Sequence, residues 1–154
     1  MRYAFVTDTP IGPLTLVEEV GALCEVRFGD QSEGLSCCET PLLKQAMQEL
    51  DEYFSGRRKQ FTVPLAPKGT LFQQKCWQAL LQIPYGETRT YGQQAALIGQ
   101  PKACRAVGMG NHRNPLPIFI PCHRVIGKNG TLTGYAGGMA IKAKLLQIER
   151  KNPT

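Results

Sequence analysis

The stretch TYGQQAALIGQPKACRAVGMGNHR, residues 90–113, decides how the second half of this chain folds. It opens with Thr90, a residue type that caps helices, and Gln93 follows at the spacing of a capping box. The tripeptide Gly99-Gln100-Pro101 ends this first helical segment in a tight turn, and residues 102–112 form a second segment. Two short helices joined by a three-residue turn predict a helix-turn-helix.

The second of these helices combines positive charge with small side chains. Small residues let a helix backbone approach a partner closely, while each glycine inside a helix costs about 1 kcal/mol relative to alanine. We therefore favour docking of this helix on nucleic acid; the alternative is a packed pair of helices whose glycines face another helix. The basic residues are Lys102, Arg105 and Arg113, and the small residues are Ala103, Ala106, Gly108 and Gly110.

The charge of the chain is divided unevenly along its length. The 154 residues carry a net charge of +6, but residues 1–67 sum to −4 and residues 68–154 sum to +10. A segment this basic attracts polyanions, of which nucleic acid is the leading candidate. A basic surface that binds nothing is the alternative, and charge alone leaves both open.

Composition excludes several other classes of protein. Hydrophobic residues make up 42% of the chain and charged residues 19%, which is typical of a globular protein and too apolar for a disordered one. No apolar run approaches the roughly 20 residues that a membrane span needs. Residues 1–10 lack the apolar core of a secretory signal, so we expect a cytoplasmic protein without membrane association.

The remaining pattern predicts an α+β fold with two domains, residues 1–67 and 68–154. Thr40 and Thr70 each mark the start of a helix, the second with a capping box completed by Gln73. We expect a small antiparallel sheet with one helix in the first domain and a helical, winged-helix-like second domain. The predicted strands are 2–7, 14–18, 22–28, 118–120 and 131–135, and the other predicted helices are 41–54, 70–83 and 139–149.

The chemistry concentrates at Cys122, His123 and Arg124, which end an apolar run. Nearby positive charge stabilises a thiolate, so we expect the pKa of Cys122 to be lowered. On an extended chain His123 would point away from Cys122, and a turn or a bridging water would have to couple them. Glu149 is one of only two acidic residues in the basic half and could orient His123 as a proton acceptor. A Cys-His dipeptide is more often structural than catalytic, and spacing alone does not decide.

The other cysteines offer no metal site. The sequence has no C-x-x-C pair, and His112 and His123 are its only histidines, so we expect no structural zinc. Cys24, Cys76 and Cys104 have apolar neighbours, and we expect them to pack as small hydrophobic residues.

Residues 118–127, IFIPCHRVIG, resemble the P-C-H-R-V motif of the O6-alkylguanine-DNA alkyltransferases, also called methylated-DNA–protein-cysteine methyltransferases. The resemblance runs from about Thr70 to Glu149, and the first third of the chain matches only in its outline of strands and helix. Several separate segments match in the same order. They are Thr90-Tyr91-Gly92, residues 102–108, Asn114-Pro115 and residues 134–138.

This resemblance implies a role for each matching position. Cys122 would be the nucleophile and alkyl acceptor, activated by His123 through a water and by Glu149. Asn114 would brace the loop of the active site with hydrogen bonds, and Tyr91 would contact the target nucleotide and help to protonate the departing guanine. Arg105 would enter the base stack in place of the flipped base, on a helix that docks in the minor groove. The further DNA-binding positions would be Lys102, Ala106, Gly108 and Arg113.

The resemblance also implies the substrate pocket and the reaction. Pro117, Val125, Tyr135 and Ala136 would line the guanine pocket, with Ala136 where some relatives have a serine. The expected activity is direct repair of O6-alkylguanine, and also of O4-methylthymine, in double-stranded DNA after base flipping. No evident second nucleophile could cleave a thioether product, so each molecule should react once. We also expect a monomer that needs no cofactor or metal.

Two other functions compete with this reading. One is a DNA-binding module without catalysis, against which Cys122 argues because relatives of that kind lack the cysteine. The other is a cysteine hydrolase with a Cys122–His123–Glu149 triad, which would leave the basic helix-turn-helix without a role.

Overall fold

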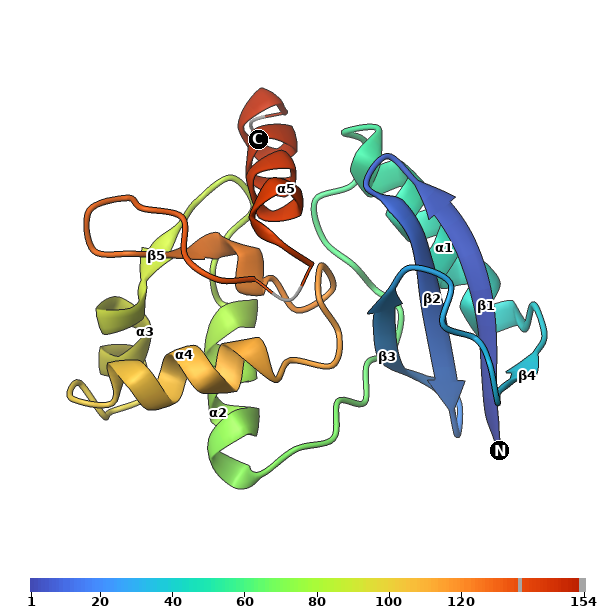
Figure 1. The fold of residues 1–154 in the computed structure, drawn as a ribbon, viewed down its shortest axis with the longest axis horizontal. Coiled ribbons are helices and arrows are strands. Elements are labelled where there is room, and N and C mark those ends of the chain that lie inside the picture. Colours follow the sequence, from blue (N-terminus) through green and yellow to red (C-terminus); the bar gives the residue numbers. More distant parts are fainter. Residues whose placement is uncertain (136, 153–154) are drawn as a thin grey trace. The chain divides into compact units, whose positions relative to one another are not determined.

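The computed structural model describes residues 1–135 and 137–152, and the chain divides into two compact units, Met1–Lys68 and Gly69–Thr154 (Figure 1). The first unit is a small mixed sheet with one helix, and the second consists mainly of short helices. The α+β class predicted from the sequence is therefore confirmed. Within the described ranges, no helix is long and apolar enough to cross a membrane.

The sheet of the first unit has the strand order β3-β2-β1-β4. Strands β1 (Arg2–Thr9), β2 (Gly12–Glu19) and β3 (Ala22–Phe28) form an antiparallel meander, as predicted, and the two-residue β4 (Ser36–Cys37) pairs parallel to β1. Leu14, Leu16 and Val17 of the central strand are fully buried. This burial drives the sheet together, since burying one such side chain contributes about 1.5–3 kcal/mol.

Helix α1 (Pro41–Phe54) packs on this sheet. The hydroxyl of Thr40 accepts a hydrogen bond from the backbone N–H of Leu43, and Pro41 occupies the first helical position, where its missing N–H costs nothing. Buried Glu49 then accepts hydrogen bonds from Thr62 and from the Val63 backbone, which ties the following segment back to the helix.

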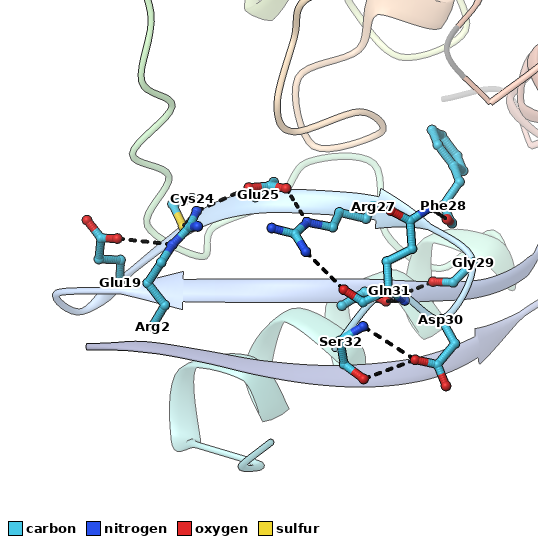
Figure 2. A network of polar contacts seen from close by, with 11 residues as sticks. Arg2, Glu19, Cys24, Glu25, Arg27, Phe28, Gly29, Asp30, Gln31 and Ser32 are labelled. Atoms are coloured by element: carbon cyan, nitrogen blue, oxygen red, sulfur yellow. Dashed lines mark hydrogen bonds and ion pairs between the residues drawn. The ribbon is translucent and has the colours of Figure 1, made fainter. Parts of the chain in front are cut away.

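Figure 2 shows a network of ion pairs and hydrogen bonds that links strands β1, β2 and β3. Arg2 of β1 lies 3.1 Å from Glu19 of β2 and 3.1 Å from Glu25 of β3, and Glu25 also pairs with Arg27. Arg27 continues the network by donating to the backbone carbonyl of Gln31 at 2.9 Å. These side chains are partly exposed, and such pairs contribute between 0 and about 1 kcal/mol each, so the apolar core carries most of the stability.

The second unit begins with α2 (Leu71–Leu81), which packs against α3 (Tyr91–Leu97) and α4 (Cys104–His112). The capping boxes predicted at Thr70 and Thr90 are both present. Helix α4 begins at Cys104 and not at Lys102 as predicted, because Pro101 and Lys102 continue the turn and the Ala103 N–H bonds to the Gln100 carbonyl.

The remainder of this unit holds the Cys122 motif. A single 3-10 turn, η1 (Cys122–Arg124), precedes the two-residue strand β6 (Val125–Ile126), which pairs parallel to β5 (Arg89–Thr90). Helix α5 (Met139–Lys151) packs against η1.

Two strands predicted from the sequence are absent from this part of the fold. Residues 118–120 form buried turns instead, with Ile118 at a φ of 76° and the Ile120 N–H bonded to the Leu116 carbonyl at 2.8 Å. Residues 131–135 belong to no strand. Both segments have strand-like composition, but within the described residues neither pairs in a strand ladder, and Ile120 forms only an isolated bridge with Pro117.

Candidate active site

Cys122 is nearly buried, with 9% of its surface exposed, and it reaches a small cavity of about 20 Å³. The cavity walls come from α3, α4, η1 and the segment before α5, which brings together residues far apart in the sequence. The volume leaves room for about one water molecule. Its described lining residues are Tyr91, Gly108, Asn111, His112, Cys122, Gly134 and Tyr135.

Cys122 and His123 lie on a helical turn and not on the extended chain considered from the sequence, so the two side chains are not forced to opposite faces. His123 is fully buried, and its Nε2 lies 2.7 Å from Oε2 of Glu149 on α5. The other ring nitrogen, Nδ1, has no hydrogen-bond partner among the described protein groups. The structure therefore brings His123 and Glu149 together and leaves one nitrogen of the imidazole available.

Arg124 completes a buried ion network with Glu149. Its guanidinium donates to Oε1 at 2.8 Å and to Oε2 at 3.0 Å, in a bidentate pair. Its third nitrogen donates to the Ile83 carbonyl at 2.8 Å, and the guanidinium lies 5.6 Å from the centre of the Tyr85 ring. Arg124 thus fixes the position of the Glu149 carboxylate, which in turn orients His123.

The ionisation of these groups differs from the expectation in one respect. Burial raises the pKa of the Cys122 thiol to about 11, and this outweighs the opposing effects of the Asn114 hydrogen bond and the Lys142 charge. The prediction of a lowered pKa is wrong for the resting protein, because the cost of burying the thiolate exceeds the stabilisation by nearby positive charge. The thiol is neutral at rest, and a base must take its proton before it can act as a nucleophile.

His123 and Glu149 have the protonation states that transfer of the thiol proton requires. Burial lowers the pKa of His123, so the imidazole is neutral and able to accept a proton. Burial opposes the ionised form of Glu149, yet the hydrogen bonds and charges of His123 and Arg124 lower its pKa to about 2. A neutral histidine bonded to a carboxylate is the arrangement that stabilises an imidazolium once a proton arrives.

Asn114 links the two ends of the buried turn that precedes Cys122. Its side-chain amide donates to the Ile120 carbonyl at 2.9 Å and accepts from the Leu116 N–H at 2.9 Å. Its hydrogen bond to the Cys122 thiol also favours the thiolate. These bonds keep Cys122 at the cavity.

A buried pair of side-chain amides joins helices α3 and α4. Gln94 of α3 and Asn111 of α4 exchange hydrogen bonds of 2.8 and 2.7 Å, and Gln94 also donates to the Cys76 carbonyl of α2. Burying such amides is tolerated only because each is paired, since an unpaired one costs about 1–3 kcal/mol.

The glycines of α4 have different surroundings. A Cβ on Gly110 would lie 3.0 Å from the sulfur of Cys76 in α2, so this glycine permits helix packing, and nucleic-acid docking is the wrong explanation for it. Gly108 is half-buried and lines the cavity, where an added Cβ would make ordinary contact with Tyr91. Cys104 is exposed, which corrects the expectation that it packs as a small hydrophobic residue.

The outer face of α4 and its flanks carry the predicted DNA-binding residues. Lys102, Arg105, Ala106 and Arg113 are all exposed. Met109 is also 59% exposed. This is a basic helix face with one large apolar side chain available to a partner.

The residues predicted for the guanine pocket are only partly brought together. Tyr135 is buried and lines the cavity with Cys122, whereas buried Pro117 and Val125 are not among its described lining residues. Ala136 lies outside the described residues.

Sequence reasoning missed two further polar residues near the cavity. Lys142 of α5 is 1% exposed, and its ammonium donates to Thr133, whose hydroxyl bonds to the phenol of Tyr91. A signal for Lys142 was present: Lys142, Leu145, Leu146 and Glu149 fall at the spacing of one helix face. No sequence signal distinguishes Thr133 from other loop threonines.

Comparisons with known proteins agree across both units. The family described as "6-O-methylguanine DNA methyltransferase, DNA binding domain" matches residues 71–151, and the family described as "6-O-methylguanine DNA methyltransferase, ribonuclease-like domain" matches residues 1–67. The constitutive methylated-DNA–protein-cysteine methyltransferase of Bacillus subtilis is 52% identical over 97% of this chain and 96% of its own length. The methylated-DNA–protein-cysteine methyltransferase of Methanosarcina acetivorans is 49% identical over 97% and 98%.

Solved structures give the same result. The crystal structure of Mycobacterium tuberculosis O6-methylguanine methyltransferase superposes with a TM-score of 0.91 at 42% identity, covering 100% of this chain and 96% of that one. The crystal structure of Mycobacterium tuberculosis OGT in complex with DNA superposes with a TM-score of 0.90 at 45% identity, covering 97% and 94%.

Proposed function

This chain belongs to the 6-O-methylguanine DNA methyltransferase family, and we propose that it repairs DNA by moving the alkyl group of O6-alkylguanine onto Sγ of Cys122. It shares the enzyme class of its relatives, the methylated-DNA–protein-cysteine methyltransferases. The observation that carries the proposal is the shared cavity of Cys122, Tyr91 and the α4 glycine Gly108, with the His123–Glu149 pair behind the cysteine.

Double-stranded DNA is the proposed partner, bound through the exposed face of α4. A relative of this chain, Mycobacterium tuberculosis OGT, has been crystallised in complex with DNA. In this chain, Lys102, Arg105 and Arg113 supply the positive charge for phosphate contacts. The O6 atom of a guanine lies on the major-groove edge of its base pair, and the Cys122 thiol is nearly buried, so it cannot reach an alkyl group on a base that stays in the stack. The base therefore has to leave the stack, at a cost of a few kcal/mol, and the cavity has to widen to receive it.

Activation of the thiol begins with His123. Nδ1 of His123 takes the thiol proton through a bridging water, and Glu149 stabilises the resulting imidazolium. The thiolate attacks the alkyl carbon, the C–O bond breaks as the C–S bond forms, and Tyr91 gives a proton to the departing guanine. The thioether that remains on Cys122 ends the reaction, so each chain transfers one alkyl group. The same route would accept O4-methylthymine.

The test is intact-mass measurement after incubation with duplex DNA that carries a single O6-methylguanine. One added methyl group on Cys122, saturating at one per chain, is the expected result. Retained DNA binding with an unchanged mass would instead identify a binding module without catalysis. Repeated turnover of a thioester or ester would identify a cysteine hydrolase.

Arg105→Ala should slow repair of duplex DNA about tenfold or more, while reaction with free O6-methylguanine changes little. The reason is that Arg105 would fill the gap left by the flipped base, a need that exists only in a duplex. Single-turnover rates on both substrates measure the difference. Arg57→Ala, which removes an exposed arginine of the first unit, is the control and should leave both rates unchanged. An equal decrease of the rate on both substrates would show that Arg105 does not fill the gap left by the flipped base.

A monomeric state and a cytoplasmic location remain predictions of the sequence. Sedimentation equilibrium of the purified chain tests the first, and a dimer at micromolar concentration would contradict it.

A further inference from the structure

Lys142 is a buried lysine that pairs with no described carboxylate. Its side chain is 1% exposed, and its ammonium donates to the Thr133 carbonyl at 3.3 Å and to the Thr133 hydroxyl at 3.5 Å. The Thr133 hydroxyl in turn lies 2.5 Å from the phenolic oxygen of Tyr91. Three side chains from α5, the preceding loop and α3 thus form one chain of hydrogen bonds that ends at the cavity of Cys122.

The chemistry of the three groups gives this chain a direction. An ammonium group only donates, whereas a threonine hydroxyl has a single proton and accepts on its lone pairs. Lys142 donates to the Thr133 hydroxyl oxygen, and in the bond between this hydroxyl and the Tyr91 phenol, where either oxygen can be the donor, we assign Thr133 as the donor. The phenolic proton of Tyr91 is then not used within the protein and points to whatever occupies the cavity.

We propose that Thr133 and Lys142 are positioning residues that hold Tyr91 as a proton donor to the guanine that leaves when its alkyl group moves to Cys122. This inference rests on the proposed function and adds the residues that prepare its acid. Neither residue touches the substrate in this scheme, and both act through Tyr91.

The proton transfers balance along the chain. As the C–O bond of O6-alkylguanine breaks, its electron pair stays with guanine, which takes the Tyr91 proton. Tyr91 regains a proton from Thr133, and Thr133 regains one from Lys142, which becomes neutral. His123 holds the proton that left the Cys122 thiol, and exchange with solvent then resets both residues. Burial lowers the pKa of Lys142, so this lysine gives up its proton more readily than an exposed one.

A competing role for Lys142 is to stabilise the Cys122 thiolate directly, since its charge favours that form. The two roles separate when the leaving group is changed. Alkylation of Cys122 by iodoacetamide needs the thiolate but no protonated guanine, because iodide leaves as an anion without a proton. Thr133 should therefore matter for transfer from O6-methylguanine and not for iodoacetamide.

The experiment compares Thr133→Val with Thr133→Ser in the full chain. Valine keeps the shape of threonine without the hydroxyl, and we expect methyl transfer from duplex O6-methylguanine to slow about tenfold or more, a part of what acid catalysis contributes. Serine restores the hydroxyl and should return the rate to within about threefold of wild type, because Oγ retains its donor and acceptor roles. The iodoacetamide rate at Cys122 should be the same in all three proteins, which also shows that the site is folded.

A double-mutant cycle with Tyr91→Phe completes the test. Without the phenol, Thr133→Val should cause no further loss, because the chain then has nothing to orient. Equal slowing of methyl transfer and iodoacetamide alkylation, failure of serine to restore the rate, or full additivity with Tyr91→Phe would each overturn the inference. If wild type transfers methyl groups and Thr133→Val matches it, only this inference fails. If wild type transfers none, the proposed function fails with it.

Discussion

Cys122→Ala should abolish methyl transfer, lowering the rate by more than about 10⁴-fold, as loss of a catalytic nucleophile does. The affinity for duplex DNA should stay within about twofold of wild type, because exposed basic residues on α4 and its flanks supply the phosphate contacts, whereas Cys122 is nearly buried. Intact-mass analysis measures the transfer, and fluorescence anisotropy with a labelled duplex measures the affinity.

The matched control is Cys37→Ala, which removes an exposed cysteine of the first unit. This variant should transfer one methyl group at the wild-type rate. Methylation that persists in Cys122→Ala would place the acceptor on another cysteine. Loss of DNA affinity together with transfer would mean that Cys122 is needed for the fold.

Glu149→Gln should lower the free energy of unfolding by about 3–5 kcal/mol, the cost of breaking a buried ion pair by removing one partner. The substitution keeps the shape of the side chain but leaves the Arg124 guanidinium buried without a countercharge. It also weakens the orientation of His123, so methyl transfer should slow as well. Urea denaturation followed by circular dichroism measures the stability.

Glu87→Gln is the control, since Glu87 is the other acidic residue of the basic half and pairs with Arg89 at the surface. Its loss should change the stability by less than about 1 kcal/mol. A similar small effect of Glu149→Gln would show that the buried network contributes little to stability.

The pH dependence of stability follows from the same carboxylate. The pKa of Glu149 is lowered from 4.5 to about 2 on folding, so the folded state binds its proton more weakly than the unfolded state. The stabilisation is therefore complete above pH 4.5 and is lost as the pH falls through about 2. It amounts to about 3 kcal/mol, at 1.36 kcal/mol for each pKa unit. Glu149→Gln should flatten this part of the curve.

Local features of this fold could be read directly from the sequence. Thr40, Thr70 and Thr90 each cap a helix as predicted, because a capping hydrogen bond joins residues only three positions apart. The antiparallel meander was predictable because short turns between neighbouring strands set their pairing. The strand predictions at 118–120 and 131–135 failed because a strand also needs a partner strand, which local sequence does not supply.

The order of the helices, the pair α3 and α4 with its short turn, and the motif around Cys122 could all be predicted from the amino-acid sequence, since each depends on neighbours within a few residues. The ionisation of the site could not, because it depends on contacts between distant segments. Arg124 stands two residues from Cys122, yet its charge serves Glu149 on α5, and the thiol is left neutral. Lys142 also lies near the site only because α5 packs there, far from Cys122 in the sequence. The energy of a charge depends on its desolvation and on partners brought from distant segments, and neither quantity is encoded in local spacing.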